Sequence, residues 1–273
     1  MLIAHEAPLS IFNMVQQFTD FDYALVHLFE ESEVYYKHFT NALKMGREVI
    51  LDNSIFELGA AFNSEKYCYW ISKLKPTWYI IPDVLEDLVG TKNKFDEWNE
   101  IYAGRVPEEC KKIAVVQGKS YAEIVECYKY IEPHVDKVAI SFDYSFFIKE
   151  FDELHPGNDK SKAYKLMVGR QNLITQLVAD GIINLNKPHH LLGCALPQEF
   201  VYYRNTGYEF IESVDTSNPI VHGLNGVLYD IQGGLQDKIS TKLIEYMHHE
   251  VTREDVCNIM YNLTLFATYC NND

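Results

Sequence analysis

The sequence predicts an α/β protein of the (β/α)8 TIM-barrel class. Short runs of β-branched and apolar residues alternate with longer stretches of helical periodicity, and eight such runs fall within residues 2–215. Apolar residues make up 47% of the 273 positions, enough for one large core, so we expect a single domain over residues 1–273. A doubly wound open sheet gives the same alternation, and periodicity alone does not separate the two folds.

The expected strands are short apolar runs bounded by polar or turn-forming residues. In an alternating α/β architecture each run forms a buried strand of a parallel sheet, because helices cover the sheet. The eight runs cover residues 2–5, 23–28, 48–52, 78–83, 113–118, 137–141, 190–195 and 209–215.

The expected helices lie between these runs, where apolar residues recur three and four positions apart. Ser32 and Ser64 are expected to cap helix N-termini, whereas Gly46 and Gly181 are expected to end helices. The predicted helices cover residues 32–46, 64–75, 93–104, 121–132 and 162–181.

Two further segments add to the predicted barrel. Residues 239–250 and 253–269 are expected to form extra C-terminal helices. Residues 142–160, after the sixth strand, are aromatic and acidic, which indicates a long loop that could serve as a lid.

The composition limits the partners and the compartment. With 24 basic and 39 acidic side chains the net charge is −15, which argues against broad non-specific binding to nucleic acid but leaves room for a local basic groove. The six cysteines form no close pair, so we expect free, mostly buried thiols in a reducing compartment and no zinc cluster. No stretch has the pattern of a signal peptide or a membrane helix, so a soluble cytoplasmic protein is expected.

Polar side chains stand at the ends of most predicted strands. In parallel α/β folds the active site forms at the carboxyl ends of the strands, so these residues are the candidates for a functional site. Like charges that gather there raise a carboxyl pKa, which suits acid–base chemistry. The strand-end candidates are His5, Glu6, His27, Asp52, Asn53, Asp83, Gln117, Ser141, Asp143, Gly193, Asp215, Thr216 and Ser217.

This set of carboxylates and amides favours chemistry at a sugar carbon or on a nucleobase. One carboxylate can attack an oxocarbenium-like carbon while a second moves the proton of the leaving group. A further aspartate and a glutamine suit the edge of a purine, because carboxylate oxygens accept from N–H groups and the amide donates to a carbonyl.

The order of these motifs resembles the tRNA-guanine transglycosylase superfamily over residues 48–270. The matching segments are "LDNSIFE" at Asp52, "IIPD" at Asp83, "VVQG" at Gln117, "LLG" at Gly193 and "VDTSNP" at Asp215. The resemblance implies a (β/α)8 enzyme that exchanges guanine in a polynucleotide for a 7-deazaguanine base, and chemistry that needs no metal or nucleotide cofactor.

The resemblance also implies a role for each matched residue. Asp215 would attack C1′ of the nucleoside to form a covalent glycosyl-aspartate, and Asp52 would supply and remove the proton on the purine. Phe56 and Leu192 would sandwich the base. The substrate-binding set it implies is Asn53, Phe56, Asp83, Gln117, Gly118, Asp143, Leu192 and Gly193.

The sequence departs from the family pattern where the substrate is chosen. The family's zinc-binding cysteine cluster is absent, and Tyr261 stands where a histidine completes that site, so no zinc subdomain is expected. Ser54 and Ile55 replace two glycines, and "KVAISFD", which ends in Asp143, replaces a glycine-rich strand. These changes leave the identity of the incoming base open.

A compact chain without the zinc subdomain or an added RNA-binding domain resembles most the DNA-guanine transglycosylases of 7-deazaguanine DNA modification, including phage systems that act in the host cytoplasm. We therefore expect DNA and a free 7-deazaguanine base as partners, with a homodimer or a partner protein also compatible. Queuosine- or archaeosine-type exchange on tRNA is the alternative. A nucleoside or glycoside hydrolase with paired carboxylates is another, and the retained Asp52 and Asp215 argue against a non-catalytic subunit.

Each candidate residue also has a purely structural interpretation. The alternatives are an Asx turn at Asp215, a cap on the loop before the helix at 64 for Asp52, a turn at Gln117 and a core position for Phe56. Asp87 is a rival for the role of Asp83, and core or supporting roles are expected for His5, Glu6 and His27. The adjacent pairs His189–His190 and His248–His249 point in different directions and are not expected to bind metal. A basic stretch offers a path for phosphates, or simply a solvated helix face; its candidates are Lys119, Lys160, Lys162, Lys165, Arg170 and Arg204.

Overall fold

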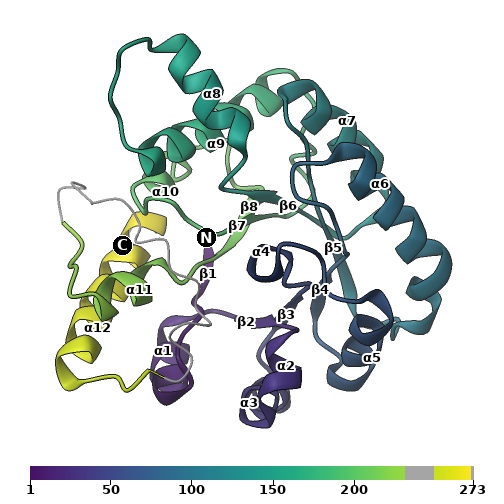
Figure 1. The fold of residues 1–273 in the computed structure, drawn as a ribbon, viewed down its shortest axis with the longest axis vertical. Helices are drawn as coiled ribbons and strands as arrows, with labels where there is room; N and C mark the ends of the chain where they lie inside the picture. Colours follow the sequence, from purple (N-terminus) through teal and green to yellow (C-terminus); the bar gives the residue numbers. More distant parts are fainter. Residues whose placement is uncertain (231–248, 272–273) are drawn as a thin grey trace. The chain divides into compact units, whose positions relative to one another are not determined.

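The computed structural model describes residues 1–230 and 249–271, and it confirms the predicted fold class (Figure 1). Eight strands belong to one sheet in the order β1-β8-β7-β6-β5-β4-β3-β2, with helices between them, as in a (β/α)8 TIM-barrel-like fold. The strands are β1 (Leu2–Ala4), β2 (Asp22–Leu25), β3 (Val49–Asp52), β4 (Trp78–Ile80), β5 (Lys111–Val115), β6 (Lys137–Ser141), β7 (His189–Leu192) and β8 (Ile211–Asp215).

All eight predicted strands are present, and their side chains are buried almost throughout. Burial on both faces explains why these strands read as apolar runs rather than as alternating patterns. The chain divides into two compact units, which we call the β2–β6 unit (residues 21–140 and 182–189) and the β8 unit (residues 1–20, 141–181 and 190–273). Each unit is described by itself.

In the β2–β6 unit, neighbouring strands pair in parallel, with Leu25 opposite Asp52 and Ile80 opposite Ile113. Its helices are α2 (Leu28–Glu31), α3 (Glu33–Lys44), α4 (Ile55–Leu58), α5 (Ser64–Leu74), α6 (Leu88–Glu97) and α7 (Tyr121–Ile131). A π-helical turn, Trp98–Tyr102, continues α6.

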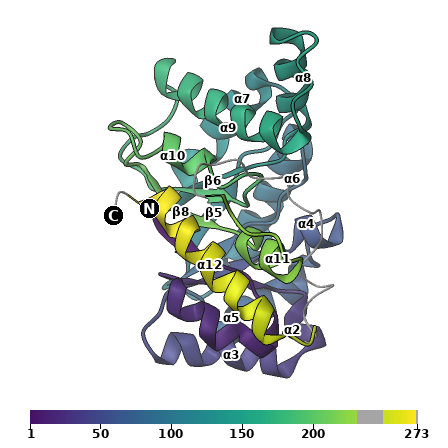
Figure 2. The same cartoon turned by 90° about the vertical axis from the view of Figure 1, so that its left-hand side faces the viewer.

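In the β8 unit, β1 pairs in parallel with β8, so that Ala4 lies opposite Asp215. Its helices are α1 (Phe12–Val15), α8 (Ser145–Leu154), α9 (Lys162–Ala179), α10 (Glu199–Tyr202), α11 (Asn218–Leu224) and α12 (Arg253–Cys270). Helix α12 runs beside α11 (Figure 2), and Ile259 and Leu263 of α12 join Ile220 of α11 and Val15 of α1 in one apolar cluster. This cluster attaches the C-terminal helix to the strand-bearing part of its unit.

The helix boundaries agree with most of the sequence signals. The Ser32 side chain caps α3 by accepting a hydrogen bond from the Tyr35 amide, and Gly46 and Gly181 follow their helices with φ of 79° and 64°. The cap of α5 was assigned to the wrong residue: Asn63 accepts from the Lys66 amide, and Ser64 is already the first residue of the helix.

One predicted loop contains a helix. Within residues 142–160, α8 covers Ser145–Leu154, because Phe146, Phe147 and Phe151 recur at helical spacing and bury one face. The predicted helix over residues 253–269 is present as α12, whereas most of the one predicted over 239–250 lies outside the described residues.

Two other sequence expectations bear on the core and on membranes. All six cysteines are free thiols, and only Cys257 is exposed. Among residues 1–230 and 249–271, no helix combines the length and the apolar character needed to cross a membrane.

Candidate functional site

Asp52, the last residue of β3, has both carboxylate oxygens engaged within the β2–β6 unit. The Tyr23 hydroxyl donates to Oδ2 at 2.8 Å and the Ser54 amide donates to Oδ1 at 2.5 Å. Ser54 has a φ of 60°, and this bond over two residues holds that left-handed turn in place. Asp52 therefore caps the turn that begins the loop before α5, as its structural interpretation expects, whereas the N-cap of α5 itself is Asn63.

Asn53, Asp83 and Gln117 form a buried cluster at the ends of β3, β4 and β5. Nδ2 of Asn53 donates to Oδ1 of Asp83 at 2.8 Å, and Nε2 of Gln117 donates to Oδ2 at 2.6 Å. All three side chains are at most 2% exposed. We call these three residues the Asp83 cluster.

Backbone groups fix both amides of the Asp83 cluster. The Ile55 amide donates to Oδ1 of Asn53 at 3.0 Å, and the Glu86 amide donates to Oε1 of Gln117 at 2.8 Å. Because each amide oxygen already accepts from a backbone N–H, each NH2 group must be the one that faces Asp83. Gln117 is therefore held by tertiary contacts, which contradicts its interpretation as a simple turn residue.

The electrostatics of the cluster centre on Asp83. Burial raises the pKa of this carboxyl from 3.8 to about 6, and the hydrogen bonds from Asn53 and Gln117 oppose the rise. A carboxyl with a pKa near neutrality in a cluster of fixed donors is typical of functional sites.

Asp87, the rival of Asp83 for this role, has a structural role instead. Its side chain caps α6 by accepting a hydrogen bond from the Gly90 amide.

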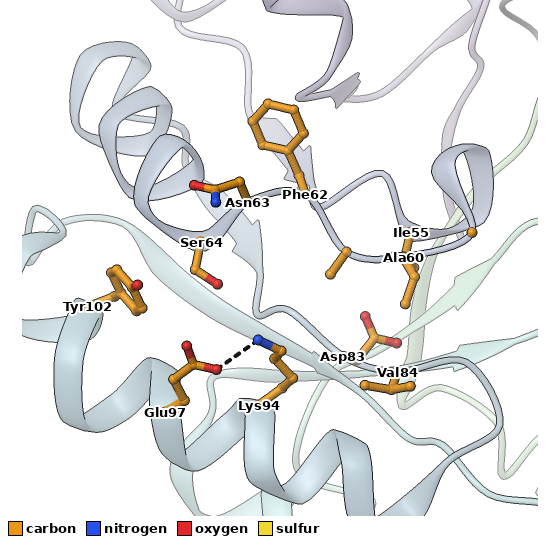
Figure 3. A pocket seen from close by; sticks show the side chains of 12 residues that line it. Ile55, Ala60, Phe62, Asn63, Ser64, Asp83, Val84, Lys94, Glu97 and Tyr102 are labelled. Atoms are coloured by element: carbon orange, nitrogen blue, oxygen red, sulfur yellow. Dashed lines mark hydrogen bonds and ion pairs between the residues drawn. The ribbon is translucent and has the colours of Figure 1, made fainter.

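A cavity of about 300 Å³ adjoins the cluster, and of the three members only Asp83 lines it (Figure 3). Figure 3 shows Asp83 beside Ile55, Ala60 and Val84, with the Lys94–Glu97 ion pair of 2.8 Å farther along. The lining residues are Ile55, Gly59, Ala60, Ala61, Phe62, Asn63, Ser64, Asp83, Val84, Lys94, Glu97 and Tyr102. Its apolar wall with a few polar groups is suited to a small organic ligand.

Phe56 lies on the short helix α4, which begins after Ser54 and ends before Gly59 (φ 76°). Its side chain is 45% exposed, so it is not a core residue. Gly118, which follows β5, is buried, and a Cβ atom there would lie 2.7 Å from Cβ of Glu123. Gly118 is therefore required for the close packing of its turn on α7.

In the β8 unit, Asp215 ends β8 and is only 4% exposed. Its Oδ1 atom lies 2.9 Å from Nε2 of His190 and accepts from the Gly193 amide at 3.3 Å. The other ring nitrogen of His190 lies 2.9 Å from Oγ of Ser213. The predicted Asx turn at Asp215 is wrong, because Thr216 makes the turn by accepting from the Asn218 amide at 3.0 Å.

Gly193 follows β7 with a φ of 66°, next to the half-buried Leu192. The carbonyls of Leu192 and Gly193 accept from the Arg170 guanidinium at 2.9 and 3.0 Å. Arg170 is fully buried and pairs with Glu199. Arg170 is therefore an anchor for this turn, and its predicted place in a phosphate-binding track was wrong.

Two further strand-end residues of this unit, Asp143 and His5, also have fixed contacts. Oδ1 of Asp143 accepts from the Ser141 hydroxyl at 2.8 Å. Nδ1 of His5 lies 3.1 Å from the Thr216 carbonyl, which only accepts, so the proton is on Nδ1. Burial lowers the pKa of His5 to about 4, so its ring is neutral near pH 7.

The predicted residues are divided between the two units. Asp52, Asn53, Phe56, Asp83, Gln117 and Gly118 belong to the β2–β6 unit, and Asp143, Leu192, Gly193 and Asp215 belong to the β8 unit. Sequence reasoning missed the contacts of Tyr23 and His190. The signal for His190 was its position two residues before Leu192 in "HHLLG", which places both side chains on the same face of β7.

Comparison with protein-family models and with curated proteins yields no match for this chain. Within the described residues no group of three histidine, cysteine, aspartate or glutamate side chains has the arrangement of a metal site. The fold and the two groups of strand-end residues therefore define the class of protein, a TIM-barrel-like α/β protein with polar clusters at the carboxyl ends of its strands.

Proposed function

We propose that this chain is a transglycosylase that replaces guanine in DNA with a 7-deazaguanine base through a covalent glycosyl-aspartate intermediate. The observation that carries the proposal is the Asp83 cluster, a buried carboxyl held by two oriented amides beside a cavity. A purine edge with N–H groups is a fitting ligand for such an acceptor. The motif order that resembles the guanine transglycosylases supports the choice of base.

The reaction consists of two displacements at one carbon. A carboxylate oxygen of Asp215 forms a bond to C1′ as the C1′–N9 bond breaks, and Asp52 gives a proton to the departing guanine. Asp52 then takes a proton from the incoming base, whose nitrogen bonds to C1′ and releases the Asp215 carboxylate. Atoms and charges balance without a metal or a redox partner, because the ester conserves the glycosidic bond energy.

In this proposal the two amides of the cluster have different tasks. Asn53 donates to both the Ile81 carbonyl and Asp83, so its amide group is fully used in orienting the carboxyl. Gln117 uses one N–H on Asp83, which leaves its second N–H for a carbonyl oxygen of the base. Asp83 accepts from the N–H groups of the base edge. The exposed ring of Phe56 is suited to stack on a base that has left the helix.

The choice of DNA over tRNA rests on the sequence. The tRNA enzymes that the chain resembles use a cysteine cluster for structural zinc, whereas the cysteines here are scattered as free thiols. The net charge of −15 favours neither nucleic acid, so discrimination would depend on local contacts.

The test is incorporation of labelled base. The protein is incubated with radiolabelled guanine, then with labelled 7-deazaguanine bases, and with either duplex DNA or tRNA. Label in DNA alone supports the proposal, and label in tRNA alone moves the substrate to tRNA. Release of free guanine without incorporation would favour a hydrolase with paired carboxylates.

Two variants assign the roles within this assay. Asp215→Ala removes the attacking group, so both exchange and the covalent protein–DNA adduct should disappear. Asp52→Ala removes proton transfer, so exchange should fall by at least about 100-fold. An Asp215→Ala variant with the normal rate would overturn the proposed nucleophile.

A further inference from the structure

The carboxylate of Asp215 is held asymmetrically. Oδ1 takes the hydrogen bonds from Nε2 of His190 and from the Gly193 amide. Oδ2 has no hydrogen-bond partner within residues 1–230 and 249–271. The two oxygens of this side chain therefore differ in their ability to act on a substrate, since one already accepts two hydrogen bonds.

The contacts of His190 define the state of its ring when Asp215 is ionised. An ionised carboxylate only accepts, so Nε2 carries a proton and donates it to Oδ1. In the neutral ring Nδ1 then accepts from the hydroxyl of Ser213, 2.9 Å away. Ser213 and Asp215 project from the same face of β8, two residues apart, so one imidazole spans both.

We propose that His190 is a positioning residue that fixes Oδ1 of Asp215 and so presents Oδ2 as the oxygen that attacks C1′. This inference rests on the proposed transglycosylase function. The acceptor-only carboxylate of Asp215 fixes the tautomer of His190, whose Nδ1 then accepts from Ser213. Arg170 supports the second contact by holding the Gly193 carbonyl. Holding a single attacking atom in the correct orientation increases the rate of a reaction by large factors.

Serine, histidine and aspartate also make up a hydrolytic triad, but the burial here contradicts that assignment. Ser213 is 1% exposed and His190 is fully buried, so neither Oγ nor the ring is accessible to a substrate. Of the three residues the aspartate has the largest exposed fraction, 4%, which favours it as the reacting group.

The hydrogen bond from His190 acts unequally on the two displacements. In the first step Asp215 loses its negative charge as Oδ2 bonds to C1′. In the second step the C1′–Oδ2 bond breaks, the charge returns to the carboxylate, and the Nε2–H donor stabilises it on Oδ1. Loss of this donor should therefore slow the second step, in which the C1′–Oδ2 bond of the ester breaks, more than the first step, in which the ester forms.

The experiment compares three variants in the exchange assay with DNA and labelled guanine. His190→Leu removes the donor, and His190→Gln can still place an N–H group near Oδ1. His189→Leu is the matched control, because the neighbouring His189 is equally buried but contacts Tyr128 and the Lys187 carbonyl instead. Thermal unfolding of each variant shows that it is folded at the assay temperature.

We expect His190→Leu to lower kcat by about 10- to 100-fold with little change in KM for guanine, as for a lost hydrogen bond to a charged group. The fraction of protein trapped as the covalent DNA adduct at steady state should rise. His190→Gln should recover most of kcat, and His189→Leu should retain it. Equal kcat values for His190→Leu and the wild type, or an unchanged adduct fraction, would overturn the inference.

A spectroscopic measurement separates this inference from the proposed function. Nitrogen NMR of the histidine rings should show His190 protonated at Nε2 in the wild type, with the signals altered in Asp215→Ala. If the wild type exchanges no base while this signature is present, the proposed function fails and the contact stands. A ring protonated only at Nδ1 would refute the positioning role whatever the activity.

Discussion

Nε2 of Gln117 donates a hydrogen bond of 2.6 Å to Oδ2 of Asp83, at the ends of two adjacent strands, β5 and β4. The bond joins residues 34 positions apart, and neither side chain is more than 2% exposed. Burial of a carboxyl without a cationic partner is costly unless amides satisfy it. The protonation state of Asp83 therefore depends on burial and on two amide donors, and its effects can be tested by varying the pH.

We predict that the KM for the free base depends on the ionisation of Asp83. Its pKa is raised to about 6, so the carboxylate that accepts from the base predominates above pH 6 and the protonated form below it. The KM for guanine should therefore rise as the pH falls from 7 to 5. Steady-state kinetics over this range measure it, and Asp83→Asn should remove the pH dependence. A KM that stays constant from pH 5 to 7 in the wild type would contradict this role.

The same carboxyl should make the folded protein less stable as the pH rises. Because the pKa in the folded state lies above the ordinary value of 3.8, the stabilisation from this group is present below pH 4 and is lost as the pH rises through 6. The full effect is about 3 kcal/mol, at about 1.4 kcal/mol for each pH unit. Urea unfolding at several pH values between 3.5 and 7 measures it, with Asp83→Asn as the reference. Identical pH profiles for the two proteins would show that Asp83 is not the cause.

The fold was predictable from the sequence because its signals are local. The eight strands are apolar runs, and residues such as Ser32 and Gly46 mark helix ends by their own conformational preferences. The sequence predicts a loop where α8 lies, because aromatic and acidic residues also suit a lid. Its three buried phenylalanines show that a hydrophobic face outweighed the polar composition.

The candidate site was predictable only in part. The topological rule for strand ends identifies Asp52, Asp83 and Asp215, because it depends on where each strand stops. It does not reveal that His190 contacts Asp215 or that Arg170 is buried, since those contacts join separate elements. Long-range pairing of polar side chains has no signature in the local sequence.

Tyr23→Phe tests the orientation of Asp52. The substitution removes the hydroxyl that donates to Oδ2 of Asp52 at 2.8 Å and leaves the ring in the core. We expect kcat of exchange to fall by about 10-fold, the effect of one hydrogen bond to a charged group, because the carboxylate that moves the proton is less well oriented. The KM for guanine should not change. If KM for guanine increased while kcat stayed the same, Tyr23 would be assigned to base binding instead.

The buried pair of Arg170 and Glu199 should behave as a coupled unit in stability measurements. Both side chains are fully buried, and removal of either one leaves the other charge unpaired. We expect Arg170→Met and Glu199→Leu each to cost about 3–5 kcal/mol of unfolding free energy. The double variant should cost clearly less than the sum, because no unpaired charge remains. Urea denaturation of the four proteins completes this cycle, and additive losses would show that the pair is not coupled.

A comparison of two glycines tests whether the turn after β7 needs more than a left-handed backbone. Gly193 and Gly181 have nearly the same φ, 66° and 64°, so alanine at either position costs about 1 kcal/mol from the backbone alone. A Cβ atom at Gly193 would lie 2.4 Å from Cδ1 of Phe142, whereas at Gly181 it would meet nothing within 4 Å.

We therefore expect Gly193→Ala to lose at least about 1 kcal/mol more than Gly181→Ala in urea unfolding, because the ring of Phe142 must shift. The displaced turn would also move the Gly193 amide away from Oδ1 of Asp215, so kcat should fall for Gly193→Ala and not for Gly181→Ala. Equal losses of stability and full activity in both variants would mean that the ring of Phe142 moves freely. The turn after β7 would then keep its position, and the close approach of Phe142 would not require glycine at residue 193.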